Sequence, residues 1–155
     1  MSETKTSILI VDDSPDTLEV LQRNLSSKGY RVHSSAAVLE AIDLLKTTSV
    51  DLVITDLKMP RISGIDLVRY VRENLPDTAV MMVTGFATIE SAVEAIKTGA
   101  EEYLSKPFTD EELAAAVERV LAKLKDRRAA NGVELASLTR PSTWTPLSRL
   151  IPPRL

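Results

Sequence analysis

Five short apolar segments alternate along the sequence with five longer segments of helical period, and this alternation constrains the fold more than any other feature. The segments expected as strands are residues 7–11, 30–34, 51–55, 79–83 and 102–105. In the third and fourth, apolar residues follow one another without polar alternation, which is typical of strands covered on both faces. Strict alternation of this kind predicts a parallel sheet with helices on both faces, joined by right-handed crossovers.

The segments between the strands carry apolar residues at three- and four-residue spacing, as on the buried face of a helix. The first helix is expected to begin after the N-cap Ser14 and to end near Gly29. The last is expected over 109–126 and opens on a capping box, Thr109 with Glu112. The stripes expected to be buried are, in chain order, Leu18, Leu21 and Leu25; Val38, Ala41, Ile42 and Leu45; Ile65, Val68 and Val71; Ile89, Ala92, Val93 and Ile96; and Leu113, Val117, Val120, Leu121 and Leu124.

Glycine motifs narrow the fold class. The sequence after the first strand lacks the Gly-x-Gly-x-x-Gly pattern of dinucleotide-binding folds, and no P-loop pattern occurs. The expected α/β fold is therefore the flavodoxin-like, doubly wound one, with five parallel strands in the order 2-1-3-4-5 and helices on both faces. In that order the ligand crevice lies at the carboxyl ends of strands 1 and 3, where the winding reverses.

Polar and reactive residues end the strands that border this crevice. Asp12 and Asp13 follow the first strand, Asp56 the third, Thr84 the fourth and Lys106 the fifth. Carboxylates gathered at one place repel one another unless a cation lies among them. A set of oxygen ligands without histidine or cysteine suits Mg²⁺. A solvated acidic loop would explain Asp12 and Asp13 alone, but not the four strand ends together.

The residue types that the chain lacks limit its chemistry further. The 155 residues include no cysteine and one histidine, His33, so disulfides, cysteine nucleophiles and His/Cys metal cages are excluded. Carboxylates, hydroxyls and lysines remain as the groups that could carry out chemistry. A carboxylate such as Asp56 can attack a phosphoryl group and form an aspartyl phosphate. The oxygens of that group need cations and a hydroxyl nearby, which a divalent metal, Lys106 and Thr84 can supply.

Four motifs carry the residues at these strand ends. They are Ile10-Val11-Asp12-Asp13, Thr55-Asp56-Leu57-Lys58-Met59-Pro60 with Gly64 downstream, Val83-Thr84-Gly85, and Lys106-Pro107-Phe108. In order and spacing they resemble the receiver domain of bacterial two-component response regulators, over roughly residues 6–126. The resemblance implies that Asp56 accepts a phosphoryl group from a phosphohistidine on a sensor histidine kinase. It also implies that Asp13, Asp56 and the backbone carbonyl of Lys58 ligate Mg²⁺, with Asp12 helping through water.

A conformational switch is implied by the same resemblance. Thr84 and Lys106 would hold phosphoryl oxygens, and Tyr103 would turn inward when Thr84 moves. The Lys106–Pro107 peptide bond is expected to be cis. The surface formed by the fourth helix, the fifth strand and the fifth helix is expected to shift between two arrangements, and so to control a partner, an output domain or a homodimer. Lys58 and Phe86, which flank the phosphoryl approach, either set the lifetime of the phosphoryl group or are simple surface residues.

Other functions are compatible with parts of this pattern. A haloacid-dehalogenase-type phosphatase also uses an aspartate nucleophile and Mg²⁺, but it needs a second acid two residues later, where this chain has Lys58. A constitutive interaction module is disfavoured by the intact set of acids, Thr84 and Lys106. A receiver would catalyse its own phosphorylation and its own dephosphorylation by water without a dedicated small-molecule substrate, so its status as an enzyme stays open.

The chain is expected to hold one domain, residues 1–128, followed by a tail or linker, residues 129–155, of open role. The first part has 21 acidic against 16 basic residues, and the tail has one acidic against three basic. The tail could lead to an output domain absent from this chain, as in nitrogen-regulation-type transcription activators, could be an expression artefact, or could be a docking segment anchored by Trp144, Leu147, Leu150 and Ile151. The net charge of −3 disfavours direct binding of nucleic acid. The sequence has neither a bilayer-spanning run nor a signal-peptide pattern, which predicts a cytoplasmic protein without a membrane partner.

Overall fold

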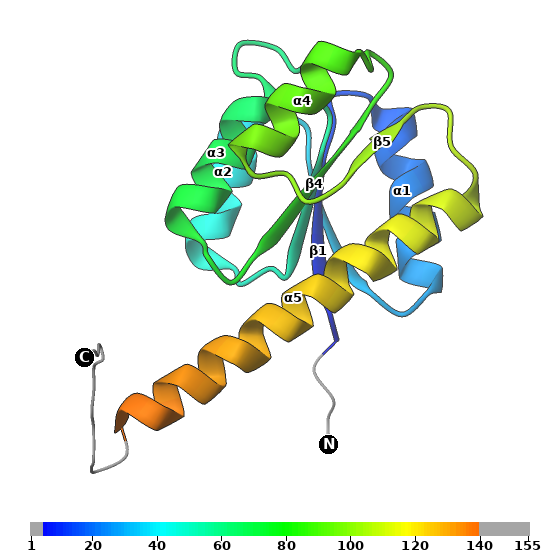
Figure 1. The fold of residues 1–155 in the computed structure, drawn as a ribbon. Coiled ribbons are helices and arrows are strands. Elements are labelled where there is room, and N and C mark those ends of the chain that lie inside the picture. The colour runs from blue at the N-terminus through cyan, green and yellow to red at the C-terminus, as the bar shows by residue number, and fades with distance from the viewer. Residues whose placement is uncertain (1–4, 140–155) are drawn as a thin grey trace. The chain divides into compact units, whose positions relative to one another are not determined.

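The computed structural model describes residues 5–139, with side chains described for residues 5–130. Internal contacts divide the chain into two units, residues 1–122 and 123–155. The first unit contains the sheet and four complete helices (Figure 1). The elements are β1 (Ser7–Val11), α1 (Pro15–Ser27), β2 (Arg31–Ser35), α2 (Val38–Thr47), β3 (Leu52–Thr55), α3 (Gly64–Asn74), β4 (Ala79–Thr84), α4 (Ile89–Thr98), β5 (Tyr103–Ser105) and α5 (Asp110–Thr139).

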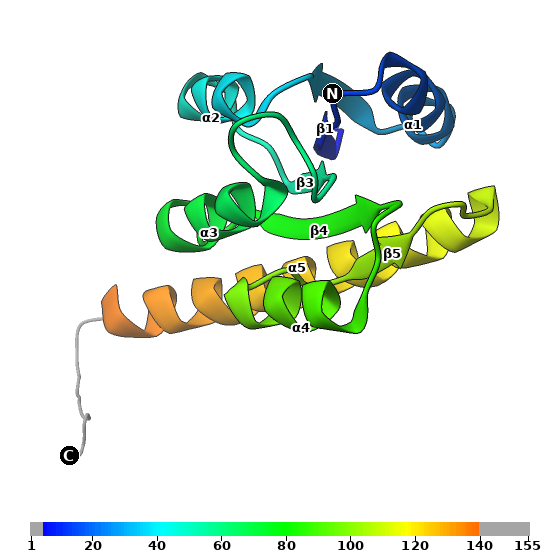
Figure 2. The ribbon, with the colours of Figure 1, turned by 90° about the horizontal axis from the view of Figure 1, so that it is seen from above.

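The five strands form one parallel sheet in the order β2-β1-β3-β4-β5, which confirms the predicted fold. Helices α2, α3 and α4 cover one face of the sheet (Figure 2). On the other face, α1 lies beside the first turns of α5, where the side-chain amide of Asn24 donates to Asp110 at 3.1 Å. The strand order therefore reverses its winding between β1 and β3, as the site prediction requires.

The core forms where the central strands are covered on both faces. Every residue of β3 and β4 is buried, as their apolar sequences predict. The edge strand β2 is mostly exposed or half-buried, because only one side of it has a neighbouring strand. Strand bounds differ from those predicted by at most one residue, since the ends of short strands depend on hydrogen bonds that the sequence pattern does not specify.

The first and last helices begin with the predicted capping chemistry, whereas α2 has no side-chain cap. The Ser14 hydroxyl accepts from the backbone N–H of Thr17 at 3.4 Å. At the start of α5, the Thr109 hydroxyl accepts from the N–H of Glu112 at 3.0 Å, and the Glu112 carboxylate accepts from the N–H of Thr109 at 2.9 Å. These bonds satisfy N–H groups that a helix leaves unpaired in its first turn.

The predicted burial of the apolar stripe on α4 is wrong. The side of α4 that faces the domain is formed by the fully buried Ala95, whereas Ile89, Val93 and Ile96 are 82%, 46% and 51% exposed. The helical period was predicted correctly, but period alone does not say which side of the helix packs on the sheet. A small alanine lets the helix lie close to the domain, and the larger side chains are left on the outer surface.

The last helix is longer than predicted, since α5 ends at Thr139 rather than near residue 126. Residues 127–139 consist mainly of good helix formers, and the next proline in the sequence is Pro141. The domain boundary placed at residue 128 falls within this helix and stays a prediction. The suggested anchors Trp144, Leu147, Leu150 and Ile151 lie outside the described residues.

Candidate functional site at the carboxyl edge of the sheet

Three carboxylates meet at the carboxyl ends of β1 and β3. The register pairs Val11 with Thr55, so Asp12 and Asp56 leave the sheet at the same level. One oxygen of each of Asp12, Asp13 and Asp56 lies within 4.8 Å of the others. Asp12 and Asp56 are 2% and 6% exposed, whereas Asp13 is exposed. The strand topology thus brings together the acids that the sequence predicted as metal ligands.

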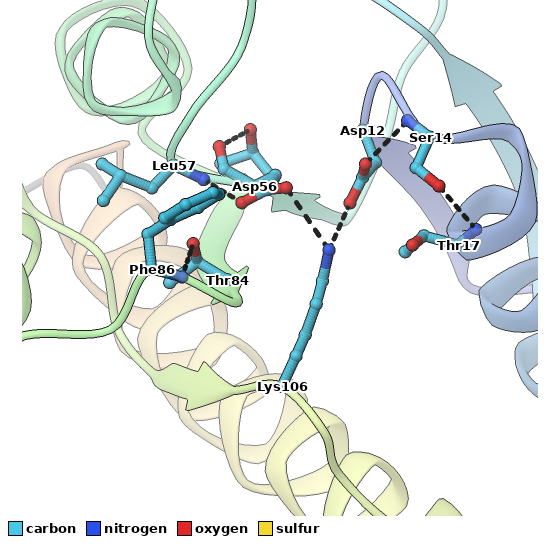
Figure 3. A network of polar contacts seen from close by, with 9 residues as sticks. Asp12, Ser14, Thr17, Asp56, Leu57, Thr84, Phe86 and Lys106 are labelled. Carbon is cyan, nitrogen blue, oxygen red and sulfur yellow. Dashed lines mark hydrogen bonds and ion pairs between the residues drawn. The ribbon is translucent and has the colours of Figure 1, made fainter.

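Lys106 lies between the two buried carboxylates (Figure 3). Its Nζ atom is 2.9 Å from Oδ2 of Asp12 and 3.3 Å from Oδ2 of Asp56. Its backbone N–H donates to the carbonyl of Thr84 at 2.9 Å, which fixes the end of β5 against β4. The Lys106–Pro107 bond is cis, as expected. The lysine is therefore placed beside the predicted phosphoacceptor.

Burial and the neighbouring charges shift the pKa values of Asp12 and Lys106 in this cluster. The pKa of the Asp12 carboxyl is raised, with burial as the largest cause and the nearby charge of Asp56 as a smaller one, although the hydrogen bonds from Lys106 and the Ser14 N–H and the charge of Lys106 act to lower it. Burial acts to lower the pKa of Lys106, but the hydrogen bonds and charges of Asp12 and Asp56 outweigh that effect and raise it. The lysine therefore stays protonated, and its single charge does not balance the carboxylates around it.

Backbone N–H groups hold the remaining oxygens of the two buried acids. The N–H of Ser14 donates to Oδ1 of Asp12 at 2.9 Å, and the N–H of Leu57 donates to Oδ1 of Asp56 at 2.6 Å. The loop after Asp56 folds back on itself, because the N–H of Gly64 donates to the carbonyl of Leu57 at 2.8 Å. A Cβ atom at Gly64 would overlap the carbonyl oxygen of Asp56, so only glycine permits this close approach. Sequence patterns did not identify these backbone donors, which depend on loop geometry.

Thr84 is fully buried at the end of β4, and its hydroxyl accepts from the backbone N–H of Phe86 at 3.0 Å. Figure 3 shows it on the same side of the site as Asp56. The Phe86 ring is 55% exposed, and Nζ of Lys58 lies 4.6 Å from its centre, within the range of a cation–π contact. Lys58, whose backbone carbonyl is a predicted metal ligand, follows Asp56 by two residues. Its side chain is directed toward Phe86.

Tyr103 lies at the start of β5, where the register pairs it with Met82, two residues before Thr84. Its half-buried ring packs against the core cluster beneath α2, α3 and α4. Its hydroxyl oxygen is 2.6 Å from Oγ of Ser91 in the first turn of α4. Ser91 was missed in the sequence, although the spacing Thr88-x-x-Ser91 at a helix start is a signal for a capping box.

The donor set of the site fits a hard divalent cation. It consists of oxygen atoms alone, two of its three carboxylates are largely buried, and it carries more negative charge than Lys106 neutralises. Mg²⁺ binds through one or two carboxylates and retained waters, which an arrangement with one exposed acid allows. A lysine and a buried hydroxyl beside an acid in such a site are the groups that phosphoryl oxygens require.

Comparisons with known proteins identify the family. The model of the response regulator receiver domain matches residues 8–118. The response regulator protein PilR of Pseudomonas aeruginosa is 40% identical over 99 residues, which are 64% of this chain and 22% of PilR. The response regulator MprA of Mycobacterium bovis is 33% identical over 128 residues, which are 83% of this chain and 56% of MprA. The solution structure of the beryllofluoride-activated NtrC4 receiver domain dimer has a TM-score of 0.73 and 30% identity, and covers 76% of this chain and 98% of that one.

The fold and the site define a doubly wound α/β domain with an acidic cluster at its topological switch point. This chain belongs to the response regulator receiver domain family of two-component systems. It spans about half of MprA and less than a quarter of PilR. Among the described helices, none combines the length and the apolar character that a membrane span needs.

Proposed function

We propose that this domain is the phosphoacceptor switch of a two-component phosphorelay, in which Asp56 accepts a phosphoryl group from a phosphohistidine of a sensor histidine kinase. One observation supports this most strongly. The buried Asp56 carboxylate lies 3.3 Å from the Lys106 ammonium, with oxygens of Asp12 and Asp13 within 4.8 Å. A buried acid that contacts a lysine and has two further acids nearby is suited to phosphoryl transfer rather than to a structural ion pair.

In the transfer, a carboxylate oxygen of Asp56 attacks the phosphorus atom. The phosphorus–nitrogen bond breaks, its electron pair stays on the imidazole, and the imidazole takes up a proton. Lys106, already beside Asp56, neutralises one phosphoryl oxygen. The Thr84 hydroxyl, which accepts from the Phe86 N–H, donates its own proton to another phosphoryl oxygen. Attack of water on the aspartyl phosphate later returns Asp56 to the carboxylate.

The acids and one carbonyl of the site would hold Mg²⁺. Asp13, Asp56 and the backbone carbonyl of Lys58 are the proposed ligands, and Asp12 acts through water. Mg²⁺ bound there would neutralise negative charge on the phosphoryl oxygens. The proposal agrees with the oxygen-only donor set and with the raised pKa of Asp12, which reflects burial first and the nearby charge of Asp56 to a smaller extent.

Phosphorylation of Asp56 adds about one negative charge and three acceptor oxygens at the site. Thr84 and Lys106 are drawn toward these oxygens, and Tyr103 turns into the space behind Thr84. Shifting the population almost completely from one arrangement to the other needs a difference in stabilisation of about 5 kcal/mol. Charge-assisted hydrogen bonds from Lys106 and Thr84, about 1.5 to 3 kcal/mol each, are of the right size.

The exposed stripe of α4, formed by Ile89, Val93 and Ile96, is the proposed output surface. Contiguous apolar groups on the outside of a domain favour contact with another protein. A second copy of this chain is one such partner, and the NtrC4 receiver neighbour is itself described as a dimer. An output domain and a separate protein are the others. For this chain we further propose a cytoplasmic location and no direct contact with nucleic acid.

Incubation with Mg²⁺ and acetyl phosphate tests the proposal. We expect the intact protein to gain the mass of one phosphoryl group, and the gain to be lost in base. Asp56→Asn is expected to abolish it, and Asp51→Asn, which changes an acid at the opposite end of β3, is the matched control. The absence of a gain in the wild-type protein, or an unchanged gain in Asp56→Asn, would contradict the proposed function.

A further inference from the structure

The hydroxyl of Ser91 takes part in three hydrogen bonds. Its Oγ atom accepts from the backbone N–H of Thr88 at 3.1 Å, donates to the carbonyl of Thr88 at 3.1 Å, and lies 2.6 Å from the hydroxyl oxygen of Tyr103. A serine hydroxyl has one proton and two lone pairs. Either hydroxyl can be the donor in the Tyr103–Ser91 pair, and Tyr103 is the donor when the single Ser91 proton points to the Thr88 carbonyl. In both cases Ser91 joins Tyr103 to the backbone of Thr88.

Two proposed switch residues therefore bind the same segment of chain, the connection from β4 into the first turn of α4. The Thr84 hydroxyl accepts from the N–H of Phe86 near the start of this connection, and Tyr103 binds Ser91 at its end. Residues 85–90, between the two contacts, are exposed. Ile89 of the exposed α4 stripe lies within this segment, two residues before Ser91. Movement of either switch residue thus releases one end of the segment that carries Ile89.

We infer that Ser91 is a positioning residue that ties Tyr103 to the first turn of α4 and so stabilises the unphosphorylated arrangement. This inference rests on the proposed function of Asp56. Inward rotation of Tyr103 breaks its bond to Ser91, and the first turn of α4 loses this hydrogen bond to β5. Removal of the Ser91 hydroxyl therefore raises the population of the switched arrangement before any phosphoryl group is present.

The ring signal of Tyr103 tests this role. In the full chain labelled with ¹³C-tyrosine, three ring systems are present, those of Tyr30, Tyr70 and Tyr103, and Tyr103→Phe assigns the third. Phosphorylated wild-type protein gives the position of the switched state. In unphosphorylated Ser91→Ala, we expect the Tyr103 signal to move toward that position. The switched population should rise about two- to tenfold, as loss of one ordinary hydrogen bond produces.

Two variants separate the Tyr103 contact from the helix cap. Thr88→Ala removes the acceptor of the Ser91 N–H, which donates to Thr88 at 2.9 Å, but keeps the Ser91 hydroxyl. Ser91→Thr also keeps a hydroxyl. Both are expected to leave the Tyr103 signal at its wild-type position. Should Ser91→Ala not fold, Ser91→Cys, whose thiol is a weak acceptor, is expected to give a smaller shift in the same direction.

An unmoved Tyr103 signal in Ser91→Ala would overturn the inference, as would an equal shift in Thr88→Ala. The mass gain at Asp56, measured on the same samples, keeps this result apart from the proposed function. A normal gain with an unmoved Tyr103 signal contradicts only the role of Ser91. A wild-type protein without any gain contradicts the phosphoacceptor function itself.

Discussion

Asp13 is the exposed member of an otherwise buried acidic cluster, and its accessibility makes it the clearest residue on which to test metal binding. A ligand that binds only the folded state stabilises it by about 2.7 kcal/mol at one hundred times its Kd. We therefore expect Mg²⁺ at one hundred times its Kd to raise the free energy of unfolding of the wild-type protein by about this amount. Asp13→Asn should lose most of the increase, because it removes a proposed ligand.

Urea unfolding with and without Mg²⁺ measures this difference. Asp16→Asn is the matched control, since Asp16 is also an exposed acid and lies three residues away, in the first turn of α1. It should keep the full Mg²⁺ effect. An equal loss in both variants would show that the ion acts through general surface charge rather than at the cluster.

The sequence leaves two roles open for Phe86 and Lys58. They either set the lifetime of the phosphoryl group on Asp56 or are simple surface residues. Their contact, with Nζ at 4.6 Å from the ring centre, joins the residues that follow Asp56 and Thr84 by two positions. We predict that a ring and a lysine at this place would limit the approach of water to the proposed aspartyl phosphate. We expect Phe86→Ala to speed the loss of the phosphoryl group several-fold, with less than about 0.5 kcal/mol change in stability because the ring is exposed.

Mass spectrometry after removal of the phosphodonor gives the rate. Phe86→Leu keeps apolar bulk without the aromatic face, so it separates shielding from the cation–π contact. A rate close to the wild-type value in Phe86→Leu assigns the effect to bulk, and Lys58→Met should then also have little effect. If the phosphoryl group were lost at the same rate from the wild-type protein and from Phe86→Ala, both residues would be simple surface residues without an effect on its lifetime.

At the scale of the elements, the exposed stripe of α4 is where prediction from sequence failed and where function is proposed. Ile96 and Leu39 are 51% and 55% exposed on α4 and α2, so they form a pair of similar exposure on different surfaces. A charge at either position should change the stability of the domain little. We expect Ile96→Glu, but not Leu39→Glu, to abolish any self-association that follows phosphorylation, because only Ile96 lies on the proposed output surface.

Light scattering on protein treated with acetyl phosphate and Mg²⁺ measures the mass in solution. The two glutamate variants are compared at equal extents of phosphorylation, so that a defect in phosphoryl transfer is not mistaken for a defect in association. Loss of association in both variants would argue against α4 as the specific contact. If the phosphorylated wild-type protein stayed monomeric, a second copy of this chain would be excluded as the partner.

The elements show how far the sequence determines the fold and the site. The apolar runs of β3 and β4 predicted buried strands, and the strand order placed Asp12, Asp56, Thr84 and Lys106 at one edge, because all these constraints act along the chain. The buried side of α4 depends instead on packing between distant segments, through Ala95. The same holds for the Tyr103–Ser91 and Lys58–Phe86 contacts, which join different loops and elements.

At the scale of the whole molecule, the division of the chain is the remaining prediction. The family model ends at residue 118, internal contacts divide the chain after residue 122, and the sequence places the boundary at residue 128. All of these positions lie within α5, and all of the site residues precede them. The buried residues Leu113, Ala116, Val117 and Val120 of this helix belong to the first unit, so a shortened chain keeps them.

A protein ending at residue 128 should therefore fold and accept a phosphoryl group in the same way as the full chain. We expect a single cooperative thermal transition within a few degrees of the full-length value, because the buried residues described for α5 all precede residue 128 and are kept. The mass gain with acetyl phosphate and the Mg²⁺ stabilisation should also be unchanged. A second variant ending at residue 112, before the buried residues of α5, is expected to lose cooperative unfolding. If the protein ending at residue 128 also lost it, at least part of the tail would belong to the domain, and the proposed boundary would have to move beyond residue 128.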